Sequence, residues 1–286
     1  MYFPYINRAG AGKDSLPSRS RISQSFPEHR FIPLPERVSS MIIFLKTIYK
    51  LGKWVYYPAI ESEQTEERSG MQCLSAILIL SPYNQKPLQL GADFVVEALT
   101  KFINGHGDAQ GGAIISNDLA AMDRIRYEAQ VNVGSVISPF NAWQIFRGCV
   151  TFPLRMQRIN ESAGIIAQWL ETRAHVTFVS YPGLESSPGH ELARKQMPNG
   201  CGGVISFGLE TDDKTVERFC AALKVVTFAV SLGHDESLIF PQPSYDERIH
   251  LYPKAFQKGF LRFSVGLEEP EDIIHDLYQA LRAVGL

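Results

Sequence analysis

The sequence predicts an α/β protein in which helices pack in layers against β-sheets. Over the last third of the chain, strand-like segments alternate with segments whose apolar residues recur at helical spacing. Further upstream, two strand-like segments at 91–99 and 111–116 flank a glycine-rich turn. The hydrophobic content of 45% over 286 residues is enough for one large or two medium-sized domains, each with its own core.

The N-terminal part of the chain has the weakest periodicity. Residues 1–40 are rich in arginine and serine and show no amphipathic period, so we expect an atypical N-terminal arm over 1–60. The segment SGMQCLSAILIL (69–80) has small residues followed by apolar ones at helical spacing. It predicts a helix that begins at Ser69 and Gly70, where backbone N–H groups would form an anion site. A plain core helix explains these residues equally well.

The middle of the chain predicts two strands followed by helices. The strands are GADFVVEAL (91–99) and GGAIIS (111–116). Helical spacing is found at 118–129, at 138–147 and at about 153–172. Pro139 and Pro153 fall near the expected helix starts, where a missing N–H costs nothing.

The last third of the chain alternates between strands and helices. Strands are expected at 175–181, 202–210, 225–230 and 260–267. Helices are expected at 190–197, 214–223 and 270–284. The final helix has Pro270 in its first turn beside Glu269, Glu271 and Asp272, which is a favourable start.

Charge and cysteine usage exclude several classes of partner. With 28 basic and 30 acidic residues the formal charge is −2, so neither nucleic acid nor an anionic membrane is expected as a partner. The apolar segment at 41–60 contains three lysines and is too interrupted to span a membrane. The cysteines show no zinc-ligand or disulfide spacing, which predicts no metal site and reduced thiols in a cytoplasmic protein. They are Cys73, Cys149, Cys201 and Cys220.

The segment EALTKFINGHGDAQGG (97–112) is the most informative for function. Lys101 follows a buried strand, and the glycines behind it let the backbone approach a ligand. This arrangement can present an amine to a bound cofactor, although a surface lysine that merely ends a strand fits the same spacing. We expect His106 and Asp108 to support the turn rather than to act as an acid/base pair.

A longer stretch around this lysine, SPYNQKPLQLGADFVVEALTKFINGHGDAQGG (81–112), resembles the cysteine/methionine-metabolism family of pyridoxal-phosphate enzymes. That family includes methionine γ-lyase, cystathionine γ-lyase, cystathionine γ-synthase and the homoserine-ester sulfhydrylases. The resemblance continues almost without a break to residue 286, for example through RMQRINESAGIIAQWL (155–170) and FLRFSVGLEEPEDIIHDL (260–277). It implies the α/β fold of the pyridoxal-phosphate-dependent transferases, of the aspartate aminotransferase type (fold type I).

The resemblance assigns roles to six residues and names the cofactor, pyridoxal 5'-phosphate. Lys101 corresponds to the lysine that bonds covalently to the cofactor, and Thr100 to a hydroxyl neighbour that contacts the cofactor phosphate. Gly70 and Met71 correspond to the backbone that cradles the cofactor phosphate. Ser231 and Arg262 correspond to the pair that holds the substrate α-carboxylate. An arginine suits a carboxylate because its planar guanidinium offers a bidentate grip. His234 stands near this pair, where the family often has a small residue, and either tunes substrate choice or has a plain surface role.

The implied reaction is γ-elimination on a sulfur amino acid, methionine or cystathionine, by a cytoplasmic homodimer or homotetramer. In this scheme Lys101 removes the α-proton while the cofactor delocalises the charge. A γ-replacement transferase acting on an activated homoserine is the alternative, and it uses the same residues.

The chain also departs from the family pattern. Ala98 stands where a serine usually contacts the phosphate, and only 30 residues separate Met71 from Lys101. One βαβ unit takes about 30 residues, whereas the family places several such units there. The aromatic residue that stacks on the cofactor ring and the aspartate that pairs with its nitrogen are not found in a matching context. We therefore expect a partial cofactor-binding domain at 61–150, an α+β C-terminal domain at 151–286, and weak cofactor binding. A truncated, inactive paralogue is the third hypothesis.

Overall fold

The computed structural model describes residues 74–77, 80–247 and 249–286, all of which belong to the compact unit Pro58–Leu286. The expected arm at 1–60 lies outside the described residues. So do Gly70 and Met71, the two residues expected to cradle a phosphate.

A three-stranded sheet precedes the long helix of the chain. Its strands are β1 (Leu74–Ile77), β2 (Phe94–Glu97) and β3 (Ala113–Ser116), in the order β1-β2-β3. β1 runs parallel to β2, and β3 runs antiparallel to it. Two short helical segments, α2 (Ser81–Asn84) and η2 (Pro87–Leu90), connect β1 to β2. The strands expected at 91–99 and 111–116 are confirmed.

The helix expected over 69–80 is wrong where the structure describes that segment, because residues 74–77 form the strand β1. A short apolar run fits helical and extended spacing equally well. All four residues pair with β2, from Leu74 opposite Phe94 to Ile77 opposite Glu97, and this pairing favours the strand.

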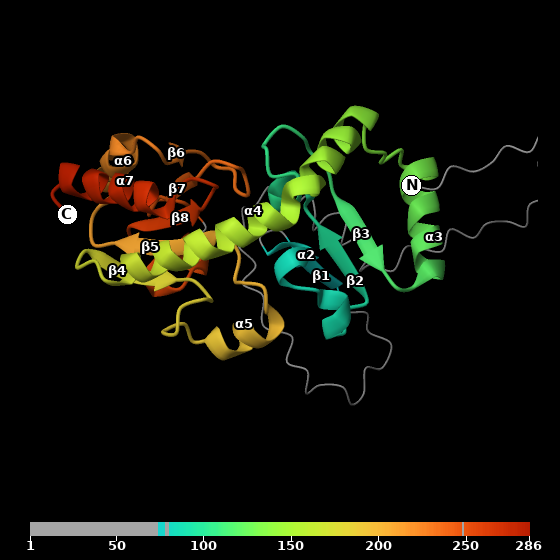
Figure 1. The fold of residues 1–286 in the computed structure, drawn as a ribbon, viewed down its shortest axis with the longest axis horizontal. Coiled ribbons are helices and arrows are strands. Elements are labelled where there is room, and N and C mark those ends of the chain that lie inside the picture. The colour runs from blue at the N-terminus through green and yellow to red at the C-terminus, as the bar shows by residue number, and fades with distance from the viewer. Residues whose placement is uncertain (1–73, 78–79, 248) are drawn as a thin grey trace, which may run out of the picture. The chain divides into compact units, whose positions relative to one another are not determined.

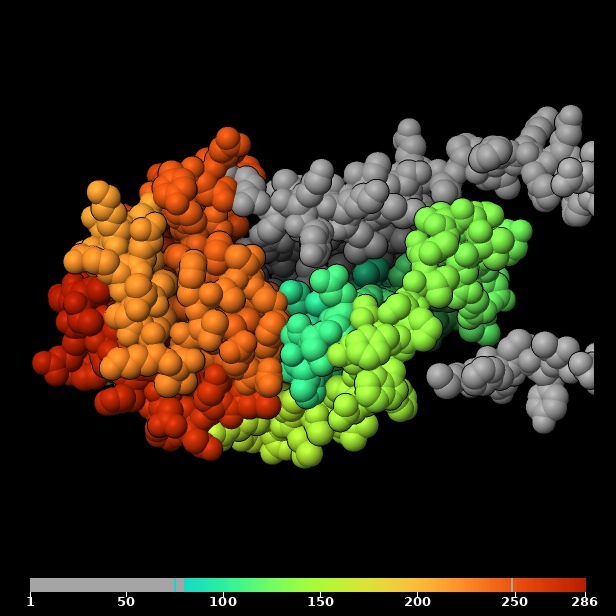
Figure 2. Space-filling view, turned by 90° about the horizontal axis from the view of Figure 1, so that it is seen from above, coloured from blue at the N-terminus to red at the C-terminus, as the bar shows by residue number. Residues whose placement is uncertain are grey.

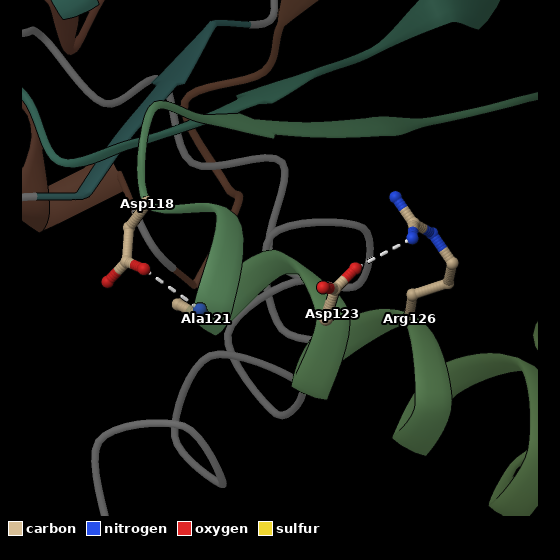
Figure 3. Close-up of polar contacts among 4 residues, drawn as sticks. All are labelled: Asp118, Ala121, Asp123 and Arg126. Carbon is tan, nitrogen blue, oxygen red and sulfur yellow. Dashed lines mark hydrogen bonds and ion pairs between the residues drawn. The ribbon is translucent and has the colours of Figure 1, made fainter.

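Helix α3 (Leu119–Tyr127) follows β3 and begins where the sequence predicts a helix. The Asp118 carboxylate accepts a hydrogen bond from the backbone N–H of Ala121 at 2.9 Å, which caps the first turn. One turn later, Asp123 and Arg126 form an ion pair at 2.8 Å on the exposed face (Figure 3). A short π-helical turn, η4 (Glu128–Asn132), continues from the end of α3.

Helix α4 (Pro139–Glu171) is one continuous helix, so the two helices expected at 138–147 and 153–172 are joined. Pro153 lies inside this helix, and its expected position near a helix start is wrong. A proline removes one helical N–H and crowds the preceding turn. Tertiary contacts hold that turn in place: Gly148 packs directly against the backbone carbonyl of Asn104, and Arg155 donates to the Gly148 carbonyl at 2.8 Å.

The C-terminal region contains a five-stranded sheet in the order β4-β5-β8-β7-β6. Its strands are β4 (Val176–Ser180), β5 (Val204–Leu209), β6 (Thr227–Phe228), β7 (Leu238–Gln242) and β8 (Phe260–Ser264). Neighbouring strands are antiparallel except for β6 and β7, which are parallel. The sequence predicts every one of these strands except β7, and it predicts β6 longer than the two residues found.

The helices of this region are α5 (His190–Gln196), α6 (Asp213–Ala222) and α7 (Pro270–Ala283), all close to their expected positions. Short 3₁₀ turns, η5 (Ile249–Leu251) and η6 (Lys254–Phe256), lie between β7 and β8. α7 contacts both α4 and α6, and the ribbon shows the three helices beside the sheet (Figure 1). None of the helices among the described residues is long and apolar enough to cross a membrane.

The main hydrophobic core lies between this sheet and the helices. α4 contributes Ile166 and Leu170, α7 contributes Leu277, and β8 contributes Leu261 and Phe263, none of them more than 1% exposed. Because side chains alternate along a strand, the residues between those of β8 project to the other face of the sheet. Arg262 and Ser264 therefore point away from the helices, toward the loop that follows β6.

Candidate functional site

The predicted cofactor lysine lies on a short π-helical turn, η3 (Leu99–Ile103), that begins two residues after β2 ends. The backbone at Lys101 is not helical, with φ −90° and ψ −135°. Its N–H donates to the carbonyl of Ala98 at 3.1 Å, and its carbonyl accepts from the N–H of Gly105 at 2.8 Å. The turn thus fixes the backbone of a half-buried lysine at the end of a buried strand.

Thr100 ties this turn to the start of β3. Its hydroxyl accepts from the Gly111 N–H at 3.0 Å and lies 3.2 Å from the Gly111 carbonyl, to which it donates. The Thr100 N–H also donates to that carbonyl at 3.2 Å. The hydroxyl proton is therefore used within the protein, so a hydrogen bond from Thr100 to a cofactor phosphate would require this proton to turn away from the Gly111 carbonyl.

Polar side chains inside the glycine-rich turn hold its shape, as expected for His106 and Asp108. The Asn104 amide donates to the Asp108 carboxylate at 2.9 Å, and this bond lowers the pKa of Asp108. Gln144 of α4 donates to the other carboxylate oxygen at 3.2 Å, and the His106 ring lies 2.6 Å from the Asn104 carbonyl. The turn is thereby attached to the first part of α4.

Arg155 of α4 holds the other side of the lysine turn, a role that the sequence did not reveal. The residue is only 6% exposed, and its guanidinium donates to the carbonyls of Phe102 at 2.9 Å, Ile103 at 3.1 Å and Gly148 at 2.8 Å. A buried arginine on a helix looks the same in sequence as an exposed one, so the sequence assigned no role to this position.

The loop between β6 and β7 packs directly on the lysine turn. Gly233 in this loop has a φ of +75°, which favours glycine, and a Cβ there would lie 2.7 Å from the Phe102 nitrogen and 3.1 Å from Lys101 Cβ. Its N–H donates to the Ser264 hydroxyl of β8 at 3.0 Å. In the space-filling view the teal-green segment around 105–112 lies between the orange loop and the yellow-green start of α4 (Figure 2).

Arg262 of β8 approaches the same loop from the sheet. One terminal nitrogen donates to the carbonyls of Val230 and Ser231, the latter at 2.8 Å. The guanidinium lies over the ring of Phe240 on β7, with its carbon 5.6 Å from the ring centroid. Burial lowers the pKa of Arg262 to about 10, so it stays positively charged at neutral pH.

The charges around Lys101 favour a neutral amine. Burial lowers its pKa, and the positive charge of Arg262 lowers it further. A lysine with a lowered pKa has more of its amine in the form that can attack a carbonyl or accept a proton. The geometry thus brings Lys101 together with Ser231 and Arg262, the pair that the sequence predicts for the substrate carboxylate.

Comparison with known proteins identifies the family of the chain. The Cys/Met metabolism PLP-dependent enzyme family matches residues 71–282. A canavanine γ-lyase from Pseudomonas canavaninivorans is 50% identical over 200 residues, covering 68% of this chain and 49% of that protein. An L-methionine γ-lyase from Fusobacterium nucleatum subsp. polymorphum is 41% identical over 209 residues, covering 71% of this chain and 52% of that protein. The chain thus spans about half the length of the curated relatives it matches.

A solved structure gives the same answer for the fold. The cystathionine γ-synthase from Xanthomonas oryzae pv. oryzae, in complex with aminoacrylate and cysteine, superposes with a TM-score of 0.69 at 37% identity. The match covers 75% of this chain and 56% of that one. The expected fold class, fold type I of the pyridoxal-phosphate enzymes, is therefore confirmed, as is the expected cofactor of the family, pyridoxal 5'-phosphate. The chain belongs to the Cys/Met metabolism family of PLP-dependent enzymes.

Proposed function

We propose that this chain catalyses γ-elimination on an amino acid, with pyridoxal 5'-phosphate bound covalently to Lys101. The observation that carries the proposal is the convergence of Lys101 with Ser231 and Arg262. The loop that contains Ser231 packs on the lysine turn through Gly233, and the charge of Arg262 lowers the pKa of Lys101.

The residues present fit covalent attachment of an aldehyde cofactor. Lys101 has a lowered pKa, and the hydrogen bonds to Ala98 and Gly105 that fix its backbone do not involve its side-chain amine. When bound, pyridoxal phosphate supplies an aldehyde for the amine and a ring that delocalises the electron pair released at the α-carbon. We assign the phosphate to Thr100 and to the backbone of Gly70 and Met71, as the family resemblance implies.

The protein's own groups then bind the substrate and move its protons. Arg262 binds the α-carboxylate together with Ser231, which fixes the orientation of the α-carbon. The neutral Lys101 amine takes the α-proton as a general base. Loss of a proton from the β-carbon would then allow the γ-substituent to leave as a thiol, and addition of water would release a 2-oxo acid and ammonia.

For the substrate we propose a sulfur amino acid, methionine or cystathionine. The methionine γ-lyase at 41% identity supports this choice, and the canavanine γ-lyase at 50% identity makes L-canavanine a necessary third substrate in any assay. A second candidate function is γ-replacement on an activated homoserine, which the match to a cystathionine γ-synthase supports. The third hypothesis, an inactive paralogue, rests on the spacing of 30 residues between Met71 and Lys101.

One experiment separates the three functions. The purified chain is incubated with pyridoxal phosphate, freed of excess cofactor and reduced with borohydride. The mass of the peptide containing Lys101 is then measured by mass spectrometry to detect attached cofactor. Release of a 2-oxo acid from L-methionine or L-cystathionine, or consumption of L-canavanine, supports elimination. Formation of cystathionine from O-succinylhomoserine and cysteine instead would support replacement. A stable folded protein with no cofactor on Lys101 would support the inactive paralogue, and Lys101→Ala is the matched control.

We also propose that the chain assembles into a homodimer or homotetramer. Along the first half of α4, large apolar side chains recur every three or four residues and are all more than half exposed. They are Phe140, Trp143, Phe146, Val150 and Leu154. Such a stripe is typical of a surface buried on association, and a second copy of the chain is the occupant we propose. Sedimentation equilibrium tests this, because Phe146→Glu should lower the assembly state if the stripe is the interface.

Two further assignments remain proposals. We place the protein in the cytoplasm, which is supported by Cys149, Cys201 and Cys220 being free thiols. We also propose the division into a partial cofactor-binding domain at 61–150 and a C-terminal domain at 151–286. Helix α4 connects the two and runs through the boundary.

A further inference from the structure

His234 is held between the substrate side of the site and the glycine-rich turn. Its ring nitrogen Nε2 lies 2.8 Å from the Ser231 hydroxyl oxygen. The ring packs on Gly107, whose φ is +67° and where a Cβ would lie 2.5 Å from His234 Cε1. His234 therefore has a fixed position next to a residue that we assign to the substrate carboxylate.

The direction of this one hydrogen bond decides what Ser231 can offer a ligand. A serine hydroxyl has a single proton to donate. If His234 Nε2 accepts that proton, Ser231 presents only lone pairs to an incoming carboxylate, and oxygen faces oxygen. If Nε2 carries a proton and donates, the Ser231 O–H is free to point at the carboxylate.

We propose that His234 is a positioning residue that turns the Ser231 hydroxyl toward a carboxylate bound at Arg262 and couples that binding to a proton on its own ring. This inference rests on the proposed function, because it takes Ser231 and Arg262 as the carboxylate site. It assigns His234 a role that its sequence position left open between substrate choice and a plain surface residue.

The surrounding charges set the sign of the coupling. Burial lowers the pKa of His234 and the positive charge of Lys101 lowers it further, while Asp235 and Glu236 oppose this. Across Gly107, the flanking His106 and Asp108 are both bonded to Asn104. Without ligand the ring is thus mainly neutral at pH 7, and it is free to accept from Ser231.

A bound carboxylate favours the donating forms of the ring, and the cationic ring always donates from Nε2. Carboxylate binding therefore raises the pKa of His234, because the ligand binds the protonated form more tightly. The same linkage makes binding strongest below the pKa of His234 and weaker above it. Arg262 stays charged throughout this range and contributes no pH dependence of its own.

The test uses the protein loaded with pyridoxal phosphate and sodium butyrate as the probe, since butyrate carries a carboxylate but no amine to react with the cofactor. Ring ¹⁵N signals of labelled histidines are followed by NMR against pH with and without butyrate. The His234→Gln variant identifies the His234 signal. His190→Gln is the matched control, because His190 also bonds through its ring, to the Pro182 carbonyl at 3.2 Å, but lies on α5.

We expect butyrate to raise the pKa of His234 and to leave the ring signals of His190 in place, and to bind about tenfold more tightly below the pKa of His234 than above it. In His234→Gln the affinity should lose its pH dependence, because the amide donates without titrating. The inference would be overturned if butyrate affinity still depended on pH in His234→Gln, or if butyrate did not change the His234 signal.

The Arg262→Gln variant separates this inference from the proposed function. If butyrate binding depends on Arg262 but not on the proton state of His234, only the role of His234 fails. If wild-type protein does not bind butyrate, or binds it equally well without Arg262, the carboxylate site itself is wrong, and both proposals fall.

Discussion

Replacing Arg155 by methionine removes the charged group that holds the lysine turn against α4. Methionine has a similar length and is apolar, so it fills the space without the guanidinium. The arginine makes three hydrogen bonds to the backbone carbonyls of Phe102, Ile103 and Gly148, and a fourth to the Thr151 hydroxyl at 3.1 Å. Gly105 leaves room for this group, since a Cβ there would collide with the guanidinium.

The three carbonyl bonds set the size of the effect. A hydrogen bond from a charged donor contributes roughly 1.5 kcal/mol, so losing three of them costs about 4.5 kcal/mol in the free energy of unfolding. Relief from burying the guanidinium offsets part of this, and we expect a net loss of about 3 kcal/mol. Arg155→Lys keeps the charge but reaches fewer carbonyls, so it should lose about half as much.

Urea unfolding measures the global loss, and amide hydrogen exchange locates it. The N–H groups of Asn104 and Gly105, which donate to the carbonyls of Leu99 and Lys101, should exchange faster in both variants. If Arg155→Met unfolds at the parental urea concentration, or if Arg155→Lys is the less stable of the two, then these bonds do not stabilise the turn.

The remaining predictions concern the proposed catalytic lysine and two buried carboxylates. Because Lys101 must be neutral to accept a proton and its pKa is lowered by burial and by Arg262, kcat, which reports the substrate-bound enzyme, should fall as the pH drops below that pKa. Arg262→Gln should move this limb to higher pH in a pH–rate profile. Glu97 is 3% exposed and burial raises its pKa to about 8, so the neutral form is favoured on folding and stability is lost as the pH rises from about 4.5 toward 8. Glu97→Gln should therefore gain roughly 2–3 kcal/mol over the parent at pH 7, and much less at pH 4, in urea unfolding; an equal gain at both would refute burial as the cause. The buried Asp276 carboxylate of α7 accepts from the N–H groups of Lys224, Val225 and Val226, so Asp276→Ala should lower the thermal unfolding midpoint by several degrees, corresponding to about 3 kcal/mol, while exposed Asp272→Ala should change it little.

Prediction of the fold succeeded where the apolar pattern had one interpretation. The strands at 204–209 and 260–264 and the helix at 270–283 have long, regular patterns, and each was found within a few residues of its expected ends. Residues 74–77 had two interpretations, and pairing with β2 selected the strand. Strand β7 was missed because Leu238–Gln242 contains a proline, which usually counts against a strand.

The residues that the sequence predicts for the site are ones that carry their own chemistry, and their roles stay predictions. Lys101 and Arg262 were chosen from the residue type and the segment around each one, and the structure places both at the same loop. Arg155 and Gly233 were not chosen, because their roles consist of contacts with segments far away in the chain. Whether Lys101, Thr100, Gly70 and Met71 hold the cofactor stays a prediction.

By itself, the sequence determined the class of fold and the family, and it indicated the lysine and arginine around which we propose that the site is built. These follow from local periodicity and from residue types in a recognisable order, both of which are properties of the chain alone. Only the tertiary structure decided that Pro153 stays inside a helix, that a buried arginine holds the lysine turn, and that His234 reaches Ser231 while its ring packs on Gly107. Each of these depends on packing between distant segments, which can outweigh the local preference of any residue.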